Sequence, residues 1–176
     1  MIGDVSHYHI HLSFTFSGGL VGICCSVLDA KKVVMTDLEY ALPLMEENVD
    51  RNREDLNYQS IKCKACDWYK PPSISELCEN SDGPDVILVA DCVWLSHLIS
   101  PLIHTLQTYA GDSTKVIITY QQRGKDAHEE FMQGIHDIFD VEVIDTEKTV
   151  GLAKPDVFYV LECTGKRVAH DHYNMN

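Results

Sequence analysis

Apolar and polar residues alternate strictly over residues 7–16, and a period of two is typical of a β-strand. A glycine turn follows at residues 17–22, and the small apolar residues 19–29 predict a helix that packs tightly on a sheet. Residues 32–36 predict a second strand, which ends at Asp37. This succession of strand, glycine turn, helix, strand and acid is typical of half of a nucleotide-binding βαβ unit.

Strands and helices continue to alternate along the rest of the chain. Helices are expected over residues 39–53, 74–78, 95–110 and 126–139, and strands over 60–66, 85–91, 116–120, 141–144 and 157–162. The uninterrupted apolar run at 85–91 is typical of a central parallel strand. No helix is expected between the last two strands, so they are predicted to form an antiparallel edge pair.

The predicted fold class is therefore α/β, a Rossmann-like, doubly wound and mostly parallel sheet with an antiparallel edge strand near the C-terminus. We expect a single domain over residues 1–165 and a loose tail over 166–176. Helical spacing predicts the inward-facing residues. They are Leu42, Met45, Val49 and Asn52 on the second helix, Leu98, Leu102, Ile103 and Leu106 on the helix over 95–110, and Phe131, Ile135 and Phe139 on the last.

The composition is that of a soluble globular domain, with 45% hydrophobic and 23% charged residues. No apolar run approaches the roughly 18 residues that span a membrane, and no secretory signal is recognisable. We therefore expect a cytoplasmic protein, with the nucleus as an alternative. The seven cysteines are an odd number and lie largely within apolar segments. They are predicted to be buried free thiols and not a disulfide framework.

The formal net charge of −13 argues against a nucleic-acid partner, because phosphate binding requires clustered lysine and arginine. An acidic surface favours a basic partner, such as a lysine-rich protein. The alternative is that the acidity serves only solubility.

Four short motifs together resemble the seven-stranded S-adenosylmethionine-dependent methyltransferases. They are Gly19-Leu20-Val21-Gly22, Thr36-Asp37-Leu38 with its following helix, Asp67-Trp68 and Asp91-Cys92-Val93-Trp94. The resemblance covers roughly residues 17–163. Within this class, the chain more specifically resembles the lysine methyltransferase-like branch, whose members modify lysines of non-histone proteins. It implies S-adenosyl-L-methionine as the cofactor and a protein substrate with an exposed lysine. We expect no nucleic-acid or membrane partner and a monomer.

The resemblance also implies roles for individual residues. The glycine turn would hold the methionine moiety, Asp37 would bind the ribose hydroxyls, and Asp67 with Trp68 would frame the adenine. The expected cofactor-binding residues are Ser17, Gly18, Gly19, Asp37, Leu38, Asp67, Trp68 and Ala90. The alternatives are that Asp37 only caps a helix and that Asp67 and Trp68 lie in an exposed loop.

Asp91 and Trp94 are the expected catalytic residues, because the resemblance places them beside the reacting amine. A lysine amine has a pKa near 10.4 and must lose a proton before it attacks. Asp91 is interpreted as an acceptor that orients the amine, and Trp94 as a cation–π contact worth about 0.5–2 kcal/mol. The alternatives are a helix cap for Asp91 and plain packing for Trp94. Arg123, which follows the strand over 116–120, is interpreted as either a substrate-side or a structural residue.

The glycine motif departs from the family pattern Glu-Leu-Gly-x-Gly-x-Gly-Leu-x-Gly. Ser13 stands at the acid, and Thr15 and Ser17 stand at the first two glycines. We therefore expect residues 1–16 to be a substituted or truncated N-terminus. A second hypothesis is a non-catalytic relative that binds the cofactor weakly. A third is an NAD(P)-binding oxidoreductase built on the same glycine turn.

No metal site is expected. Cys63 and Cys66 are spaced like metal ligands, but residues three apart on a strand point to opposite faces. His7, His9 and His11 share one strand face with Ser13 and Thr15, which is predicted to be an exposed polar face.

Overall fold

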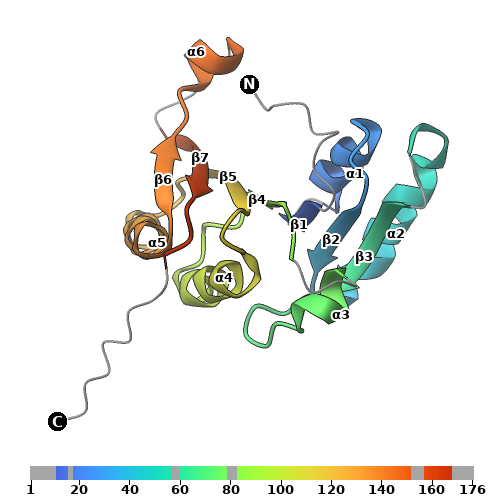
Figure 1. Cartoon of the computed structure of the whole chain (residues 1–176), viewed down its shortest axis with the longest axis horizontal. Helices are drawn as coiled ribbons and strands as arrows, with labels where there is room; N and C mark the ends of the chain where they lie inside the picture. Colours follow the sequence, from blue (N-terminus) through green and yellow to red (C-terminus); the bar gives the residue numbers. More distant parts are fainter. Residues whose placement is uncertain (1–10, 16–17, 57–59, 79–82, 152–156, 168–176) are drawn as a thin grey trace.

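The computed structural model describes residues 11–15, 18–56, 60–78, 83–151 and 157–167 (Figure 1). They form a seven-stranded sheet of order β3-β2-β1-β4-β5-β7-β6. The strands are β1 (His11–Thr15), β2 (Val33–Asp37), β3 (Ile61–Ala65), β4 (Val86–Ala90), β5 (Lys115–Gln121), β6 (Asp140–Val143) and β7 (Phe158–Thr164). The first five strands are parallel, and β7 runs antiparallel between β5 and β6. The predicted α/β class and the antiparallel C-terminal pair are confirmed.

The helices agree with the sequence pattern, with one exception. They are α1 (Leu20–Val27), α2 (Leu42–Arg51), α3 (Ile74–Cys78), α4 (Ser96–Tyr109), α5 (Lys125–Ile138) and α6 (Thr146–Val150), with 3₁₀ turns η2 (Glu39–Ala41) and η3 (Arg53–Asp55) on either side of α2. The expectation of no helix between the last two strands was wrong, because α6 lies there. The sequence contains a residue that begins this helix and one that ends it. The Asp145 side chain accepts a hydrogen bond from Lys148 N at the start, and Gly151 ends the helix with a φ of 69°.

The helices cover the sheet on both faces and create two clusters of buried side chains. The α1 and α2 helices pack on β1–β3 on one face, whereas α3, α4 and α5 cover the other face (Figure 1). The predicted inward residues Phe131, Ile135 and Phe139 are fully buried. The face of α4 is rotated from the predicted one, because Ile99 and Tyr109 are buried beside Leu102 and Leu106, while Leu98 and Ile103 are half-buried. On α2, Met45 and Val49 are buried, but Asn52 is exposed.

Ser13 corrects the expected exposed polar face of the first strand. Its side chain is fully buried because β1 is a central strand, paired with β2 and β4 and covered by α1. Its hydroxyl has no hydrogen-bond partner among the residues that the structure describes. His7 and His9 lie outside those residues.

The seven cysteines are free thiols, as predicted, but they are not all buried. Cys24 is exposed because it lies on the outer face of α1. Burial raises the pKa of the Cys25 and Cys66 thiols to about 11. No group of metal-ligating side chains occurs among the described residues. Across the same residues, none of the helices combines the length and apolar character needed to cross a membrane.

The tight packing of α1 on β2 gives a first testable prediction. A Cβ at Gly22 would lie 2.3 Å from Met35 Cγ, in the middle of a fully buried side chain. We expect Gly22→Ala to lower the free energy of unfolding by about 1–3 kcal/mol, because overpacking a closed core forces side chains to shift. Chemical denaturation measures the loss.

Gly134→Ala is the matched control in α5. Its Cβ would also lie 2.3 Å from a neighbouring carbon, but that atom is Ile103 Cδ1, the free end of a half-buried side chain. We expect nearly unchanged stability, because the alanine also favours the helix by about 1 kcal/mol. Equal losses in the two variants would contradict the difference in packing.

Candidate functional site

The carboxyl ends of four parallel strands lie in one row. Phe14 of β1 pairs with Thr36 of β2, Asp37 pairs with Ala65 at the end of β3, and Thr15 pairs with Ala90 at the end of β4. The chain order reverses between β1 and β4, and ligands bind at such a switch point in open α/β sheets. The predicted site residues that the structure describes belong to this edge of the sheet, and Ser17 lies outside the described residues.

A pocket of about 90 Å³ lies where β2 and β3 end. It brings together four of the predicted cofactor-binding residues and four others. The lining residues are Thr36, Asp37, Leu38, Cys66, Asp67, Trp68, Tyr69 and Leu98. Asp37 and Asp67 are held side by side because Cys66 N donates a 2.8 Å hydrogen bond to the main-chain oxygen of Asp37.

Asp37 ends β2 with its carboxylate at the pocket. Its Oδ1 accepts a 2.7 Å hydrogen bond from the N–H of Leu38. Burial raises the pKa of the Asp37 carboxyl above its ordinary value, and the Leu38 N–H opposes the shift. The helix-cap alternative is not supported, because Leu38 and Ala41 occupy the cap positions of η2 and α2 and neither makes a side-chain cap. A partly desolvated carboxylate is therefore available for donors such as ribose hydroxyls.

Asp67 and Trp68 form the second wall of the pocket. Asp67 is exposed, and its Oδ1 accepts a 3.0 Å hydrogen bond from Tyr69 N. Trp68 is half-buried and packs edge-on against Phe14, with 6.2 Å between the ring centroids. Trp68 is therefore anchored to the core and does not lie in a free loop, which leaves a flat aromatic wall beside two carboxylates.

The glycine turn lies next to this pocket but does not line it. Gly18 and Gly19 have φ values of 62° and 91°, which favour glycine. Asn48 of α2 donates a 3.0 Å hydrogen bond from Nδ2 to the main-chain oxygen of Gly18. Ser17 and Phe16 lie outside the described residues.

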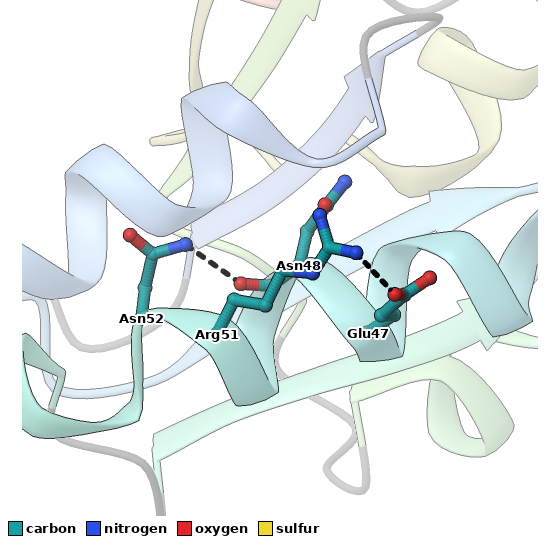
Figure 2. A network of polar contacts seen from close by, with 4 residues as sticks. All are labelled: Glu47, Asn48, Arg51 and Asn52. Atoms are coloured by element: carbon teal, nitrogen blue, oxygen red, sulfur yellow. Dashed lines mark hydrogen bonds and ion pairs between the residues drawn. The ribbon is translucent and has the colours of Figure 1, made fainter.

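Asn48 lies on a part of α2 whose polar side chains also form local contacts (Figure 2). Asn52 Nδ2 donates a 2.7 Å hydrogen bond to the main-chain oxygen of Asn48, and Arg51 pairs with Glu47 at 2.5 Å. The glycine turn therefore takes its position from α2 as well as from β1.

Asp91 follows β4 in a left-handed backbone conformation, with φ of 56°. Its N–H donates a 2.7 Å hydrogen bond to Thr119 O, and its Oδ2 forms an ion pair with Arg123 Nη2. The cap of α4 is Leu95, so Asp91 does not cap that helix. The ion pair shows that Arg123 belongs to the same end of the sheet.

Cys92 follows Asp91 and lies close enough to Asp37 for the charge of that carboxylate to act on its thiol. Its thiol is almost fully buried and lies 3.6 Å from Phe14 O, and burial followed by the charges of Asp37 and Asp91 raises its pKa. Both carboxylates therefore act on one buried thiol. Trp94 is 37% exposed, which argues against a purely core role. Neither Asp91, Trp94 nor Ala90 lines the pocket.

Sequence reasoning missed several residues of this site. Thr36, Cys66 and Tyr69 flank predicted residues, so their positions at the two strand ends were the available signal. Leu98 comes from α4, where helical spacing predicts an inward-facing residue but does not indicate a place in the pocket. Tyr69 reaches the same helix, because its hydroxyl donates a 3.0 Å hydrogen bond to His97 O.

The fold is that of the seven-stranded S-adenosylmethionine-dependent methyltransferases. A Methanococcus jannaschii fibrillarin pre-rRNA processing protein superposes with a TM-score of 0.65 over 94% of this chain and 70% of its own, at 14% identity. A predicted O-methyltransferase from Agrobacterium tumefaciens superposes with a TM-score of 0.69 over 96% of this chain and 78% of its own, at 9% identity. The antiparallel β7 between β5 and β6 also differs from the 3-2-1-4-5-6 order of dinucleotide-binding folds, which argues against the oxidoreductase alternative.

The chain belongs to the lysine methyltransferase family, whose profile matches residues 16–138. It is 29% identical over 143 residues to the protein-lysine N-methyltransferase EFM6 of Saccharomyces cerevisiae, covering 74% of this chain and 56% of that protein. It is 31% identical over 123 residues to the protein-lysine N-methyltransferase rrg1 of Schizosaccharomyces pombe, covering 68% of this chain and 41% of that protein. The chain thus spans about half the length of these curated relatives.

Proposed function

We propose that this chain is an S-adenosylmethionine-dependent methyltransferase that modifies a lysine of a protein substrate. The observation that carries the proposal is the single pocket that gathers Asp37, Asp67 and Trp68 at the switch-point edge of the sheet. Membership of the lysine methyltransferase family supports the choice of acceptor. The net charge of −13 supports a basic substrate surface. We further propose a cytoplasmic monomer.

The described residues fit the nucleoside part of the cofactor. The partly buried Asp37 carboxylate suits two ribose hydroxyls, which donate hydrogen bonds. The half-buried Trp68 ring and Asp67 suit the adenine, which has both a flat face and amino donors. Gly18 and Gly19 keep side chains away from the turn where the methionine end would lie. When bound, the cofactor supplies an electrophilic methyl group on a sulfonium.

The acceptor side of the site belongs to Asp91 and Trp94. Methyl transfer is an in-line displacement, so the protein must chiefly hold the amine in position. Asp91 would accept a hydrogen bond from the neutral amine, and the exposed Trp94 ring would contact its methylene groups or a cation. No side chain here needs to take part covalently.

Calorimetric titration separates the candidate functions. Micromolar binding of S-adenosylmethionine and S-adenosylhomocysteine, together with transfer of labelled methyl groups to lysine-containing proteins, is the expected result. Binding of NAD alone would overturn the proposal.

A non-catalytic relative is the second candidate, and Ser13 is the observation that favours it. Serine stands where the family pattern has an acid, and its hydroxyl is buried without a hydrogen-bond partner among the described residues. Loss of that acid would weaken the hold on the methionine end. Absence of binding to any of the three ligands would favour this candidate.

The raised pKa of Asp37 predicts that cofactor affinity falls at acidic pH, which gives the plot of affinity against pH an acid limb. Ribose hydroxyls stabilise the ionised carboxylate, so binding lowers a pKa that burial raises in the free protein. Affinity for S-adenosylhomocysteine should be constant near neutral pH and should fall as the pH drops through the raised pKa of the free protein. Titrations between about pH 4.5 and 8 measure this limb. Asp37→Asn should bind more weakly and lack the limb, and an unchanged limb in that variant would assign it to another group.

A further inference from the structure

The two carboxylate oxygens of Asp91 have different surroundings. Oδ2 forms the ion pair with Arg123 Nη2, and both side chains are about half-exposed. Oδ1 is shielded from solvent and has no hydrogen-bond partner among the described residues. The backbone is fixed by the hydrogen bond from Asp91 N to Thr119 O, so the carboxylate is held between β4 and β5. One oxygen is thus neutralised by a cation, while the other still lacks a donor.

A carboxylate beside the acceptor amine creates a chemical conflict. It can orient the amine by accepting a hydrogen bond, but an unpaired negative charge within about 4–6 Å raises the pKa of the amine by about 1–3 units. The amine must be neutral to attack, and its pKa already lies near 10.4 in water. A lone Asp91 carboxylate would therefore hold the nucleophile in its unreactive ammonium form.

We infer that Arg123 is a positioning residue that resolves this conflict. Its guanidinium compensates the charge of Asp91 through Oδ2, so that the half-exposed carboxylate orients the amine without stabilising the ammonium. A guanidinium is planar and presents its donors in a rigid fork that matches a carboxylate, which makes it suited to this task. The inference rests on the proposed function for its biological meaning. The effect of Arg123 on a bound ammonium can be measured without it.

Other titratable groups lie on the segments that follow or adjoin the ends of the strands near the ion pair. They are Cys92 beside Asp91, Asp37 at the end of β2, His97 in the first turn of α4, and Lys125, Asp126 and His128 at the start of α5. His128 Nδ1 lies 2.9 Å from the hydroxyl of Tyr120, and Lys125 lies 3.5 Å from Glu129. All of them remain in an Arg123 variant, so a difference from the wild type reports Arg123 itself.

The direct test measures binding of n-butylammonium, an analogue of the lysine side chain, by NMR titration at pH 7. Arg123→Gln should bind it about 10-fold more tightly than the wild type, because the freed carboxylate attracts the cation. Arg123→Lys should resemble the wild type. Arg167→Gln is the matched control, because Arg167 forms a similar exposed pair with Asp140 at the other end of the sheet. In this variant the NMR signals of residues next to Asp91 should respond to n-butylammonium as they do in the wild type. Equal or undetectable binding by Arg123→Gln overturns the inference.

The pH dependence of kcat gives the second readout once methyl transfer is observed. kcat rises with pH as the substrate amine loses its proton, and Arg123→Gln should shift this rise upward by about one pH unit. The shift lowers kcat about 10-fold at pH 7 and leaves it near wild type at high pH. The double variant Asp91→Asn/Arg123→Gln should return the rise to its wild-type pH with a lower maximal kcat. A uniform loss of kcat at every pH would mark a purely structural role and overturn the inference. Failure of the wild type to bind S-adenosylhomocysteine would instead overturn the proposed function.

Discussion

Asp91→Ala is expected to lower the rate of methyl transfer by about 100-fold while leaving cofactor affinity nearly unchanged. The loss follows from the proposed acceptor role, because Asp91 is fixed at the end of β4 by its N–H bond to Thr119 and holds a carboxylate at the carboxyl edge of the sheet. Without it the amine loses its orienting acceptor. Affinity is preserved because Asp91 does not line the pocket. Single-turnover transfer of labelled methyl groups, with a parallel titration of S-adenosylhomocysteine, measures the two quantities.

Asp85→Ala is the matched control, because Asp85 precedes the same strand at its opposite end. Its turnover should stay near that of the wild type. If Asp91→Ala instead loses cofactor affinity and turnover in the same proportion, Asp91 belongs to the cofactor site. If it loses neither, Asp91 has no part in the reaction.

Asp37→Ala is expected to weaken binding of S-adenosylmethionine and S-adenosylhomocysteine by about 10- to 100-fold. Hydrogen bonds to a charged group contribute about 1.5–3 kcal/mol, and burial at the pocket reduces competition from water. Calorimetry measures the loss directly. The fold should be retained, because the Asp37 main-chain bond to Cys66 does not depend on the side chain.

Asp137→Ala provides a comparison for net charge, because it removes an exposed acid from α5 at a distance from the pocket. It should bind the cofactor like the wild type. An unchanged affinity in Asp37→Ala would remove this residue from the site and with it the main support for the nucleoside pocket.

The sequence was sufficient for the sheet because its parallel strands are short segments, either apolar runs or alternating apolar and polar residues, separated by helical patterns. Val86–Ala90 is such a run, and the acid that follows it is Asp91. Asp37 was predictable from its position after an apolar strand, whereas Asp67 and Trp68 were expected from the family resemblance. The topology brings all three to one edge of the sheet.

The parts of the fold and the site that could not be predicted depend on contacts between residues that are distant in the sequence. Arg123 is 32 residues from Asp91, and Asn48 is 30 residues from Gly18, so no local spacing links either pair. The burial of Ser13 was missed because the alternating pattern indicates a half-exposed strand, whereas β1 is covered on both faces by its place in the middle of the sheet. Local periodicity describes one face of an element at a time, and the order of strands decides which face meets solvent.

The hydrogen bond from Cys66 N to Asp37 O joins the end of β2 to the residue that follows β3. The Asp37 side and the Asp67 side of the pocket cannot move apart without breaking it, so both must loosen together. The rate at which the Cys66 amide proton exchanges with deuterium therefore reports how often this end of β2 and β3 opens, both with and without a bound ligand.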